Sequence, residues 1–565
     1  MARAARRLIP DLAGGTSMTV MSRFFERAMR LPPPLTRDVD VQRDLRVPMP
    51  DGVTLLADRY VPAAAASAQL PLILVRCPYG RRGPFGMLSG RLFAERGFQS
   101  VVQSCRGTFG SGGELDPLGV TEAADGLATV EWLRKQPWYP GSFGTWGPSY
   151  LGITQWALAT LGLPDHKAMA VQVSSTRPRD LIQPNGSFSL ETMLEWIDQV
   201  ARQERTGAMF RQQLRARKLR ELAGQLPLGD LDRLATGATV PYWQSWLTED
   251  AEFWDQHQFA AGPGRLTATV AMTAGWYDFF LPAQLRDFAR LRAAGQQPRL
   301  TIGPWRHTDN EAAATWVRDG LDFLQAQLNS AASLDATGTA PRVRIFVTGA
   351  EQWRDLPDWP PPSSPQTWYL QPDGGLGPVL PAASEPDRYT YNPADPTPSL
   401  AGPVGNSGRA RVDNRVLEAR PDVLTYTSAP LAADTEVMGV PVVTLHVSSS
   451  REHTDFFARV CEVDPAGQSL NVCDALLRLS PGQPAVAADG TRLAQFELWP
   501  VAHRFAAGNR LRLQVSSGAH PRYARNPGTA DPLATATLLV TQDQRVYHDP
   551  EHPSALTLPL VTDTR

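Results

Sequence analysis

The sequence predicts an α/β protein whose parallel sheet is interrupted by a helical insertion and followed by an all-β domain. Short apolar strands alternate with helix-periodic segments between residues 70 and 160, and the alternation resumes after residue 268. Such alternation is typical of a parallel sheet covered by helices. Beyond about residue 356, many short strands of alternating polarity follow a segment rich in Pro, Ser and Asp, which indicates a sandwich or jelly roll.

The length and composition are those of a globular protein with several domains. The chain has 565 residues, of which 42 % are hydrophobic and 20 % are charged. Its 55 basic and 57 acidic residues give a net charge of −2, so the overall charge does not favour nucleic acid or a membrane surface as a partner. It has no run of 18 apolar residues that predicts a membrane span, and its four cysteines without a CxxC spacing predict free thiols in the cytoplasm.

The strands of the core can be followed in order along the chain. An Asp51-Gly52 turn joins two strand-like segments as a hairpin. Residues 70–76 are a short apolar run, which predicts a strand buried on both faces, and residues 98–103 are interpreted as another buried strand. Residues 125–136 repeat apolar side chains at helical spacing, and residues 143–146 form a further predicted strand.

These patterns divide the chain into four parts. The first 30 residues carry six arginines and lack the continuous apolar run of a signal peptide, so we expect a poorly ordered arm, either disordered or weakly helical. A long charged segment with helical periodicity and few strand signals predicts that a helical cap interrupts the sheet. The predicted parts are the arm (1–40), the α/β core (41–155 and 246–355), the helical cap (156–245) and the C-terminal β-domain (356–565).

A serine stands where the last of these strands meets a helix, in the sequence Gly147-Pro-Ser149-Tyr150-Leu-Gly152. A serine on such a sharp turn is exposed as a nucleophile, and the helix that follows offers a backbone N–H to a developing oxyanion. The second glycine comes one residue later than in the usual G-x-S-x-G pattern. An ordinary surface turn also fits so short a pattern. The assignment of Ser149 as a nucleophile therefore depends on finding a base and an acid elsewhere in the chain.

Two later strand ends supply such partners. Asp278 follows Gly275-Trp276-Tyr277 at the end of one apolar strand, and His307 lies just past another strand at 300–302. A serine hydroxyl is a poor nucleophile until a base takes its proton. The order Ser149, Asp278, His307 is that of α/β-hydrolases, and open α/β sheets place their sites at carboxyl strand ends. We therefore predict that these residues form a catalytic triad.

Further motifs extend from residue 41 to the end of the chain. They are Val47-Pro-Met-Pro-Asp51-Gly52, Cys77-Pro-Tyr79, Arg106-Gly107, Gly147 to Gly152, Gly275 to Asp278, Gly303 to His307, Leu424 to Pro430, Thr454-Asp-Phe456 and Gln514 to Ser517. In these segments the chain resembles the cocaine esterase-like (CocE/NonD) hydrolases, a family related to X-Pro dipeptidyl-peptidases and α-amino acid ester hydrolases. The late glycine is normal in that family. Ser104 is a departure, because the family commonly has Asp there, and we expect only a structural salt bridge to be missing.

The resemblance implies an α/β-hydrolase core, a helical cap insertion and a C-terminal jelly roll of the galactose-binding type. It also implies a tyrosine in the oxyanion hole, which Tyr79 matches. The Tyr79 hydroxyl would join the backbone N–H of Tyr150 as the second donor. Neither a metal nor an organic cofactor is implied, and the expected partner is a small-molecule ester or amide. The oligomeric state stays open, a homodimer included.

The residues after Asp278 predict an apolar acyl pocket. Relatives that act on aminoacyl substrates hold the ammonium with a carboxylate cluster, part of which follows this aspartate in the amino acid ester hydrolases. Here Phe279-Phe280-Leu-Pro follows, without an acid before Asp287. The expected pocket residues are Phe280, Trp276 and, from the cap, Trp196, although packing in the cap equally explains Trp196. The cap also carries Glu191, Glu195 and Asp198, which the sequence alone does not place.

These observations predict a serine carboxylic-ester hydrolase that acts through an acyl-enzyme. The same triad serves ester and amide hydrolysis, so an amidase, an X-Pro dipeptidyl-peptidase or an aminoacyl ester hydrolase remains an alternative. An acyltransferase that uses an alcohol or amine in place of water is another. A protein of a different class, which binds carbohydrate through the jelly roll, is permitted by fold analogy.

Overall fold

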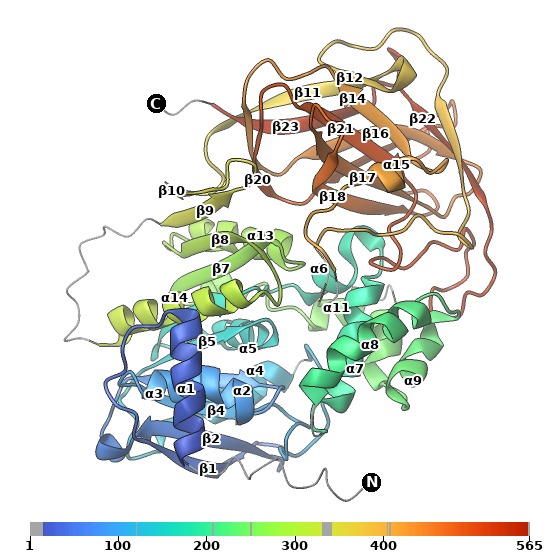
Figure 1. The fold of residues 1–565 in the computed structure, drawn as a ribbon. Coiled ribbons are helices and arrows are strands. Elements are labelled where there is room, and N and C mark those ends of the chain that lie inside the picture. The colour runs from blue at the N-terminus through green and yellow to red at the C-terminus, as the bar shows by residue number, and fades with distance from the viewer. Residues whose placement is uncertain are drawn as a thin grey trace, which may run out of the picture.

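The computed structural model describes residues 15–119, 121–205, 208–248, 251–329, 342–403, 405 and 408–562. Figure 1 shows a sheet-and-helix core with the C-terminal β-domain stacked on one end and a group of helices at one side. The predicted fold class, an α/β-hydrolase core with a cap and a β-domain, is confirmed. The core, the cap and the β-domain all contribute residues to one cavity.

The core is a mixed sheet with strand order β1-β2-β4-β3-β5-β6-β7-β8-β9-β10. Neighbouring strands from β4 to β9 are parallel, whereas the outer pairs are antiparallel. The strands are β1 (Val39–Pro48), β2 (Thr54–Pro62), β3 (Leu72–Cys77), β4 (Gln99–Ser104), β5 (Phe143–Pro148), β6 (His166–Gln172), β7 (Thr269–Tyr277), β8 (Arg299–Arg306), β9 (Val343–Val347) and β10 (Gln352–Leu356). Every residue of β3 and β4 is buried, as expected for strands covered on both faces.

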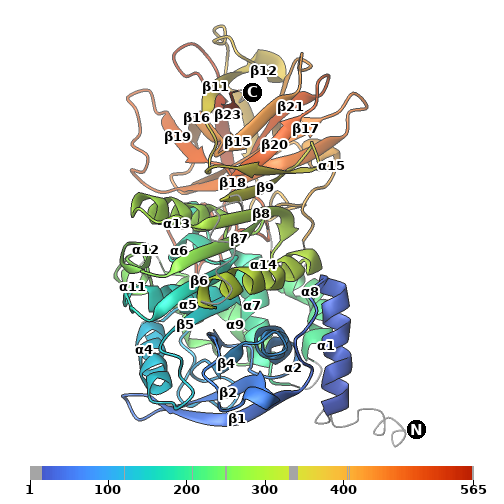
Figure 2. The ribbon, with the colours of Figure 1, turned by 90° about the vertical axis from the view of Figure 1, so that its left-hand side faces the viewer.

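Helices connect the parallel strands and cover the sheet (Figure 2). The main ones are α4 (Thr121–Arg134), α5 (Tyr150–Ala159), α13 (Leu281–Ala293) and α14 (Asn310–Leu328). Helix α14 packs across β5 to β8, and α5 packs on β3, β5 and β6. A shorter helical stretch between β3 and β4 comprises α2 (Gly83–Gly86), η2 (Met87–Arg91) and α3 (Leu92–Ala94).

The arm expected over residues 1–40, disordered or weakly helical, forms a helix and the start of a strand in its described part. Helix α1 (Gly15–Met29) packs against α14, and β1 already begins at Val39. The helix places apolar side chains against the core at helical spacing: Met18, Met21, Phe25 and Met29. Arg37 then ties the arm to the core, because it pairs with both Glu26 and Glu95. Residues 1–14 lie outside the described residues.

The predicted cap boundaries, 156 and 245, are wrong at both ends. Helix α5 continues to Ala159, and β6 lies between β5 and β7 in the core sheet. Strand β6 was missed because it is short and opens with the polar pair His166-Lys167, so its sequence pattern is weak. The insertion therefore runs from β6 to β7. It contains α6 (Pro178–Ile182), η3 (Pro184–Gly186), α7 (Leu190–Arg202), α8 (Ala208–Leu222), η4 (Leu228–Asp230), α9 (Leu231–Thr236), α10 (Pro241–Trp246), α11 (Ala251–Gln256) and α12 (Gly262–Arg265).

The C-terminal domain is built of largely antiparallel strands, with β12 and β14 as a parallel pair. The strands are β11 (Ser363–Gln371), β12 (Gly375–Gly377), β13 (Asp387–Tyr391), β14 (Leu424–Ser428), β15 (Thr435–Gly439), β16 (Val442–Ser449), β17 (Thr454–Val463), β18 (Ser469–Leu479), β19 (Arg492–Glu497), β20 (Val501–Phe505), β21 (Arg510–Ser516), β22 (Gln542–Tyr547) and β23 (Ala555–Val561). One apolar cluster joins this domain to the cap and the core sheet, and it includes Trp243, Trp276 and Trp499.

A buried charge network supports the face of the β-domain that meets the core. Asp474 binds Arg459 at 2.8 Å and Arg522 at 2.5 Å, and all three side chains are almost fully buried. Burial opposes ionisation of Asp474, but the two guanidinium groups outweigh it and hold its pKa below the ordinary value. The Arg522 guanidinium lies 5.4 Å from the ring centre of Trp499, whose Nε1 donates to the backbone carbonyl of Asp278 at 3.3 Å.

Replacing Asp474 tests how much this network stabilises the protein. Asp474→Asn leaves two buried guanidinium groups without a carboxylate, and breaking one side of a buried pair costs about 3–5 kcal/mol. We expect the midpoint of thermal unfolding, followed by circular dichroism, to fall by several degrees. The control is Glu385→Gln, which removes the exposed pair with Arg388 and leaves the midpoint near that of the parent. An unchanged midpoint for Asp474→Asn would contradict a stabilising role.

Candidate active site

Ser149 sits on a strained turn between β5 and α5. Its backbone has φ 59° and ψ −123°, a region that residues other than glycine rarely occupy. The turn has no room for a side chain at Gly147, where a Cβ would lie 2.4 Å from the Cβ of Leu151. At Gly152 a Cβ would lie 2.4 Å from the Cβ of Ser174, just after β6. The late glycine of the motif is therefore required by the close approach of α5 to that segment.

The structure brings Ser149, His307 and Asp278 together from the ends of β5, β8 and β7. The His307 Nε2 atom is 3.0 Å from Ser149 Oγ, and its Nδ1 atom is 2.7 Å from Asp278 Oδ2. Asp278 is fully buried, and its Oδ1 accepts a hydrogen bond from the Phe280 N–H at 2.8 Å. Because an ionised carboxylate only accepts hydrogen bonds, Nδ1 carries the proton in this pair and Nε2 is left to accept the serine proton.

Tyr79 lies just after β3, with its phenol beside Ser149. Its hydroxyl interacts with the Ser149 side chain and accepts a hydrogen bond from Trp196 Nε1 at 3.0 Å. Burial raises the pKa of Tyr79 above its ordinary value, so the phenol keeps its proton and can donate it. Tyr150 is the first residue of α5, and the first N–H groups of a helix have no acceptor inside the helix. Both predicted oxyanion donors thus lie next to Ser149.

The Tyr150 side chain is anchored by a buried network that sequence reasoning missed. Its hydroxyl donates to Glu122 Oε1 at 2.7 Å and accepts from the Leu118 N–H at 3.2 Å. The other oxygen of Glu122 pairs with Arg76 at 2.8 Å. The only sequence signal was an arginine inside the apolar run of β3, which requires a buried anionic partner. The network holds the residue whose N–H is the predicted oxyanion donor.

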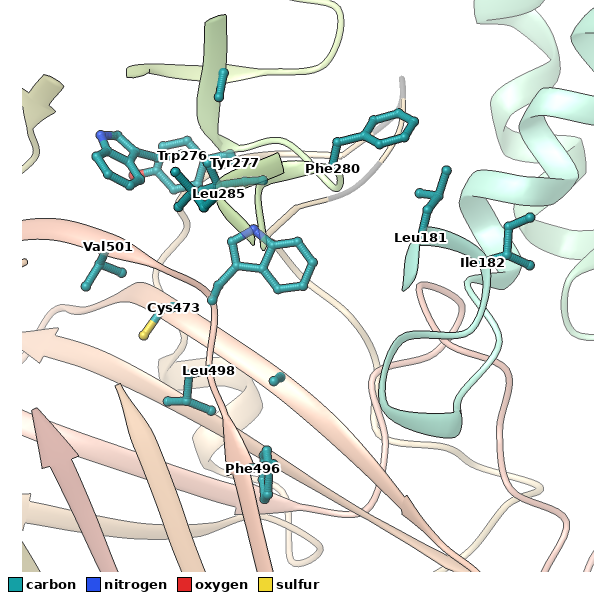
Figure 3. Packing of buried hydrophobic residues seen from close by; sticks show 14 of the residues in the cluster. Leu181, Ile182, Trp276, Tyr277, Phe280, Leu285, Cys473, Phe496, Leu498 and Val501 are labelled. Atoms are coloured by element: carbon teal, nitrogen blue, oxygen red, sulfur yellow. The ribbon is translucent and has the colours of Figure 1, made fainter. Parts of the chain in front are cut away.

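A cavity of about 220 Å³ opens beside Ser149, between the core and the cap. Its walls are mostly apolar, and they include Phe279, Phe280, Leu181, Ile182, Met193, Trp196, Trp246 and Trp316. Figure 3 shows the Phe280 ring directed toward Leu181 and Ile182 of the cap. Phe279, which was not among the expected pocket residues, stacks on His307 with ring centres 4.3 Å apart. Two of the three expected pocket residues, Phe280 and Trp196, therefore line the cavity.

Trp276 does not line this cavity, so that prediction is wrong. Its Nε1 donates to the carbonyl of Phe346 at 2.6 Å, and its ring packs on Trp359 with centres 5.4 Å apart. Side chains alternate between the two faces of a strand, and Trp276 of β7 points toward Phe346 of β9 and Trp359 just before the β-domain. Closeness to Asp278 in the sequence did not determine which face the ring would occupy.

The structure also places the three acids of the cap. Glu191 pairs with Arg220, and Asp198 pairs with Arg202 and Arg215, so both are parts of salt bridges. Glu195 is buried and lines the cavity. A Cβ at Gly405 of the β-domain would lie 2.7 Å from Glu195 Oε2, and Glu195 engages another group of the protein. One carboxylate of the cap therefore belongs to the pocket wall.

Ser104 leaves the surrounding charge network largely in place. Its hydroxyl accepts a hydrogen bond from Arg81 at 3.1 Å, and Arg81 also pairs with Asp58 at 2.9 Å and with Asp44. Among the described residues, no group of three or more His, Cys, Asp or Glu side chains could hold a metal ion. No described helix is long and apolar enough to cross a membrane, and the four cysteines carry free thiols.

Two family models together match most of the chain. Residues 51–309 match the X-Pro dipeptidyl-peptidase (S15 family), and residues 336–557 match the X-Pro dipeptidyl-peptidase C-terminal non-catalytic domain. The chain is 32 % identical to a cocaine esterase from Rhodococcus sp. over 581 residues, which cover 92 % of this chain and 98 % of that protein.

Solved structures show the same fold over nearly the whole chain. An α-amino acid ester hydrolase aligns with a TM-score of 0.77 at 24 % identity, covering 93 % of this chain and 97 % of that one. A CocE/NonD family hydrolase from Staphylococcus aureus aligns with a TM-score of 0.67 at 17 % identity, covering 92 % and 93 %. With these similarities and the geometry around Ser149, the chain is a serine ester hydrolase that belongs to the cocaine esterase-like (CocE/NonD) family.

Proposed function

We propose that the enzyme hydrolyses carboxylic esters of small apolar or aromatic acids, with Ser149, His307 and Asp278 as its catalytic triad. The observation that carries this proposal is the pair of hydrogen bonds on His307, 3.0 Å to Ser149 Oγ and 2.7 Å to Asp278 Oδ2. A histidine held between a serine and a buried carboxylate is able to take the serine proton and to keep the resulting positive charge stable.

In the first half of the reaction, His307 Nε2 removes the proton of Ser149 as Oγ forms a bond to the acyl carbon. The carbonyl π electrons move to the oxygen, and this oxyanion accepts hydrogen bonds from the Tyr79 hydroxyl and the Tyr150 N–H. When the intermediate collapses, His307 gives its proton to the departing alcohol. The bond between the acyl carbon and that alcohol breaks, which leaves the acyl group on Ser149.

In the second half, His307 takes a proton from water as the water oxygen attacks the acyl-enzyme. The same two donors hold the second oxyanion, and His307 returns its proton to Ser149 as the acid leaves. Asp278 keeps its charge throughout, orients the imidazole and stabilises the imidazolium. Protons and electrons balance over the cycle without any further co-reactant.

The acyl preference is supported by the walls of the cavity. A benzoyl or alkanoyl group buried among Phe280, Leu181 and Ile182 is stabilised by about 25 cal/mol per Å² of apolar area. Glu195 favours the main alternative, an aminoacyl substrate, because a carboxylate in the wall would suit an ammonium group. Since Glu195 already engages another group of the protein, we favour the neutral acyl group.

The nucleophile is tested by Ser149→Ala, which should fold normally and lose ester hydrolysis by several orders of magnitude. His307→Ala should lose a comparable share of kcat/KM. The double variant should have nearly the same kcat/KM as either single variant, because the residues act as a unit. The measurement is kcat/KM on a p-nitrophenyl ester, with Ser449→Ala on the distant strand β16 as the matched control. Retention of a tenth of the activity by Ser149→Ala would show that the nucleophile is misassigned.

The acyl preference is tested with p-nitrophenyl butyrate and benzoate beside free-amine phenylglycine esters and aminoacyl-proline anilides. We expect the neutral esters to exceed the free-amine esters by at least about tenfold in kcat/KM, or about 1.4 kcal/mol. A free ammonium in an apolar wall loses hydration, and acetylating the amine should rescue a poor aminoacyl substrate. If the free-amine substrates react faster and Glu195→Gln removes that advantage, the aminoacyl alternative replaces this proposal.

We also propose that the enzyme works in the cytoplasm. All four cysteines are buried free thiols, and thiols stay reduced in that compartment. Fractionation of the native cells checks this location, and recovery of the esterase outside the cytoplasmic fraction would contradict it.

A further inference from the structure

We propose that Trp196 of the cap is a positioning residue for the oxyanion hole, in addition to being part of the pocket wall. Its indole N–H holds the Tyr79 oxygen so that the phenolic proton is directed at the oxyanion formed beside Ser149. This inference rests on the proposed role of Tyr79 as an oxyanion donor. Its test therefore has to separate a failure of Trp196 from a failure of Tyr79.

The contact joins two distant parts of the chain. Trp196 lies on α7 of the cap and Tyr79 on the loop after β3, 117 positions earlier, yet Nε1 and the phenol oxygen are 3.0 Å apart. Beyond this bond, the phenol hydroxyl interacts with the Ser149 side chain. The Tyr79 oxygen thus contacts both the indole of the cap and the side chain of Ser149.

The direction of the bond follows from the chemistry of the two groups. An indole nitrogen is only a donor, so the Tyr79 oxygen must accept from Trp196. The phenolic proton cannot point back along the same line and is available to the groups on the Ser149 side. Accepting one hydrogen bond also polarises a hydroxyl and makes it a better donor. The Tyr79 hydroxyl therefore accepts from Trp196 and lies beside Ser149, whose own side chain is hydrogen-bonded to His307.

Packing keeps both rings in place. Phe85 lies against Tyr79 with ring centres 5.2 Å apart, and Trp246 lies against Trp196 at 5.6 Å. Trp196 also stacks on Tyr150, with ring centres 6.2 Å apart and planes within 6° of parallel. One cap residue therefore contacts both residues assigned to the oxyanion hole. Because charge on the substrate oxygen develops in the transition state, a loss of this positioning should lower kcat more than it changes KM.

The test removes only the indole N–H. Replacing Trp196 by benzothienylalanine keeps a bicyclic ring of the same shape and puts sulfur in place of the N–H group. Trp196→Phe is the simpler second variant. Each change is made in the parent enzyme and in Tyr79→Phe, and kcat and KM are measured on p-nitrophenyl butyrate, with circular dichroism as the check on folding.

We expect Tyr79→Phe alone to lower kcat by about 10²-fold or more, as the loss of one oxyanion donor does. Benzothienylalanine at position 196 should lower kcat by about three- to tenfold in the parent, the range expected for one hydrogen bond. It should cause no further loss in Tyr79→Phe, because no phenol is left to orient. The matched control is Trp246→Phe, which trims a neighbouring indole of the same wall; its effect should be the same in both backgrounds.

Three results would overturn the inference. If the benzothienylalanine enzyme keeps the parent kcat, the N–H does not position Tyr79. If its loss of kcat is equally large in Tyr79→Phe, the ring acts through packing alone. If Tyr79→Phe itself keeps the parent kcat, the oxyanion assignment of the proposed function fails, and the inference about Trp196 fails with it.

Discussion

The turn at Ser149 is the constraint on which the rest of the active site depends. Holding a non-glycine residue at φ 59° costs about 1–3 kcal/mol, so the surrounding structure must maintain it. Strand β5 and helix α5 do so, and they approach each other and β6 closely enough to require glycine at 147 and 152. The geometry places the serine at the start of α5 and puts the first N–H group of that helix, the proposed oxyanion donor, next to it.

Each domain of the protein contacts this turn or its partners. The core supplies the three residues of the proposed triad and holds Tyr150 through the buried pair Glu122–Arg76. The cap supplies Trp196, which binds the Tyr79 hydroxyl. The β-domain supplies Trp499, whose N–H reaches the backbone carbonyl of Asp278. The site is therefore a product of the whole assembly, and the apolar cluster shared by the three parts keeps the distances between these groups short.

Most of the fold followed from local patterns. Strand β3 opens with four apolar residues, Leu72 to Val75, and every residue of β3 and β4 is buried, as expected for central strands. Strand β6 was missed because its seven residues begin with a polar pair and carry no turn signal of their own. Helix α1 was expected only as a disordered or weakly helical arm, because its helix-spaced methionines pack against α14, which lies far along the chain.

The sequence by itself determined the chemistry of the site: a serine on a strand-to-helix turn, then an aspartate and a histidine after later strands. Parallel strands bring their carboxyl ends to one edge, so the order along the chain was enough to place these three together. Only the tertiary structure decided which side chains surround them. Trp276 faces the β-domain although it lies two residues from Asp278, while Trp196 and Glu195 reach the pocket from a cap helix far along the chain. The face that a side chain occupies at the end of a strand, and the place where the cap packs on the core, depend on contacts between distant segments. Local sequence patterns do not predict such contacts.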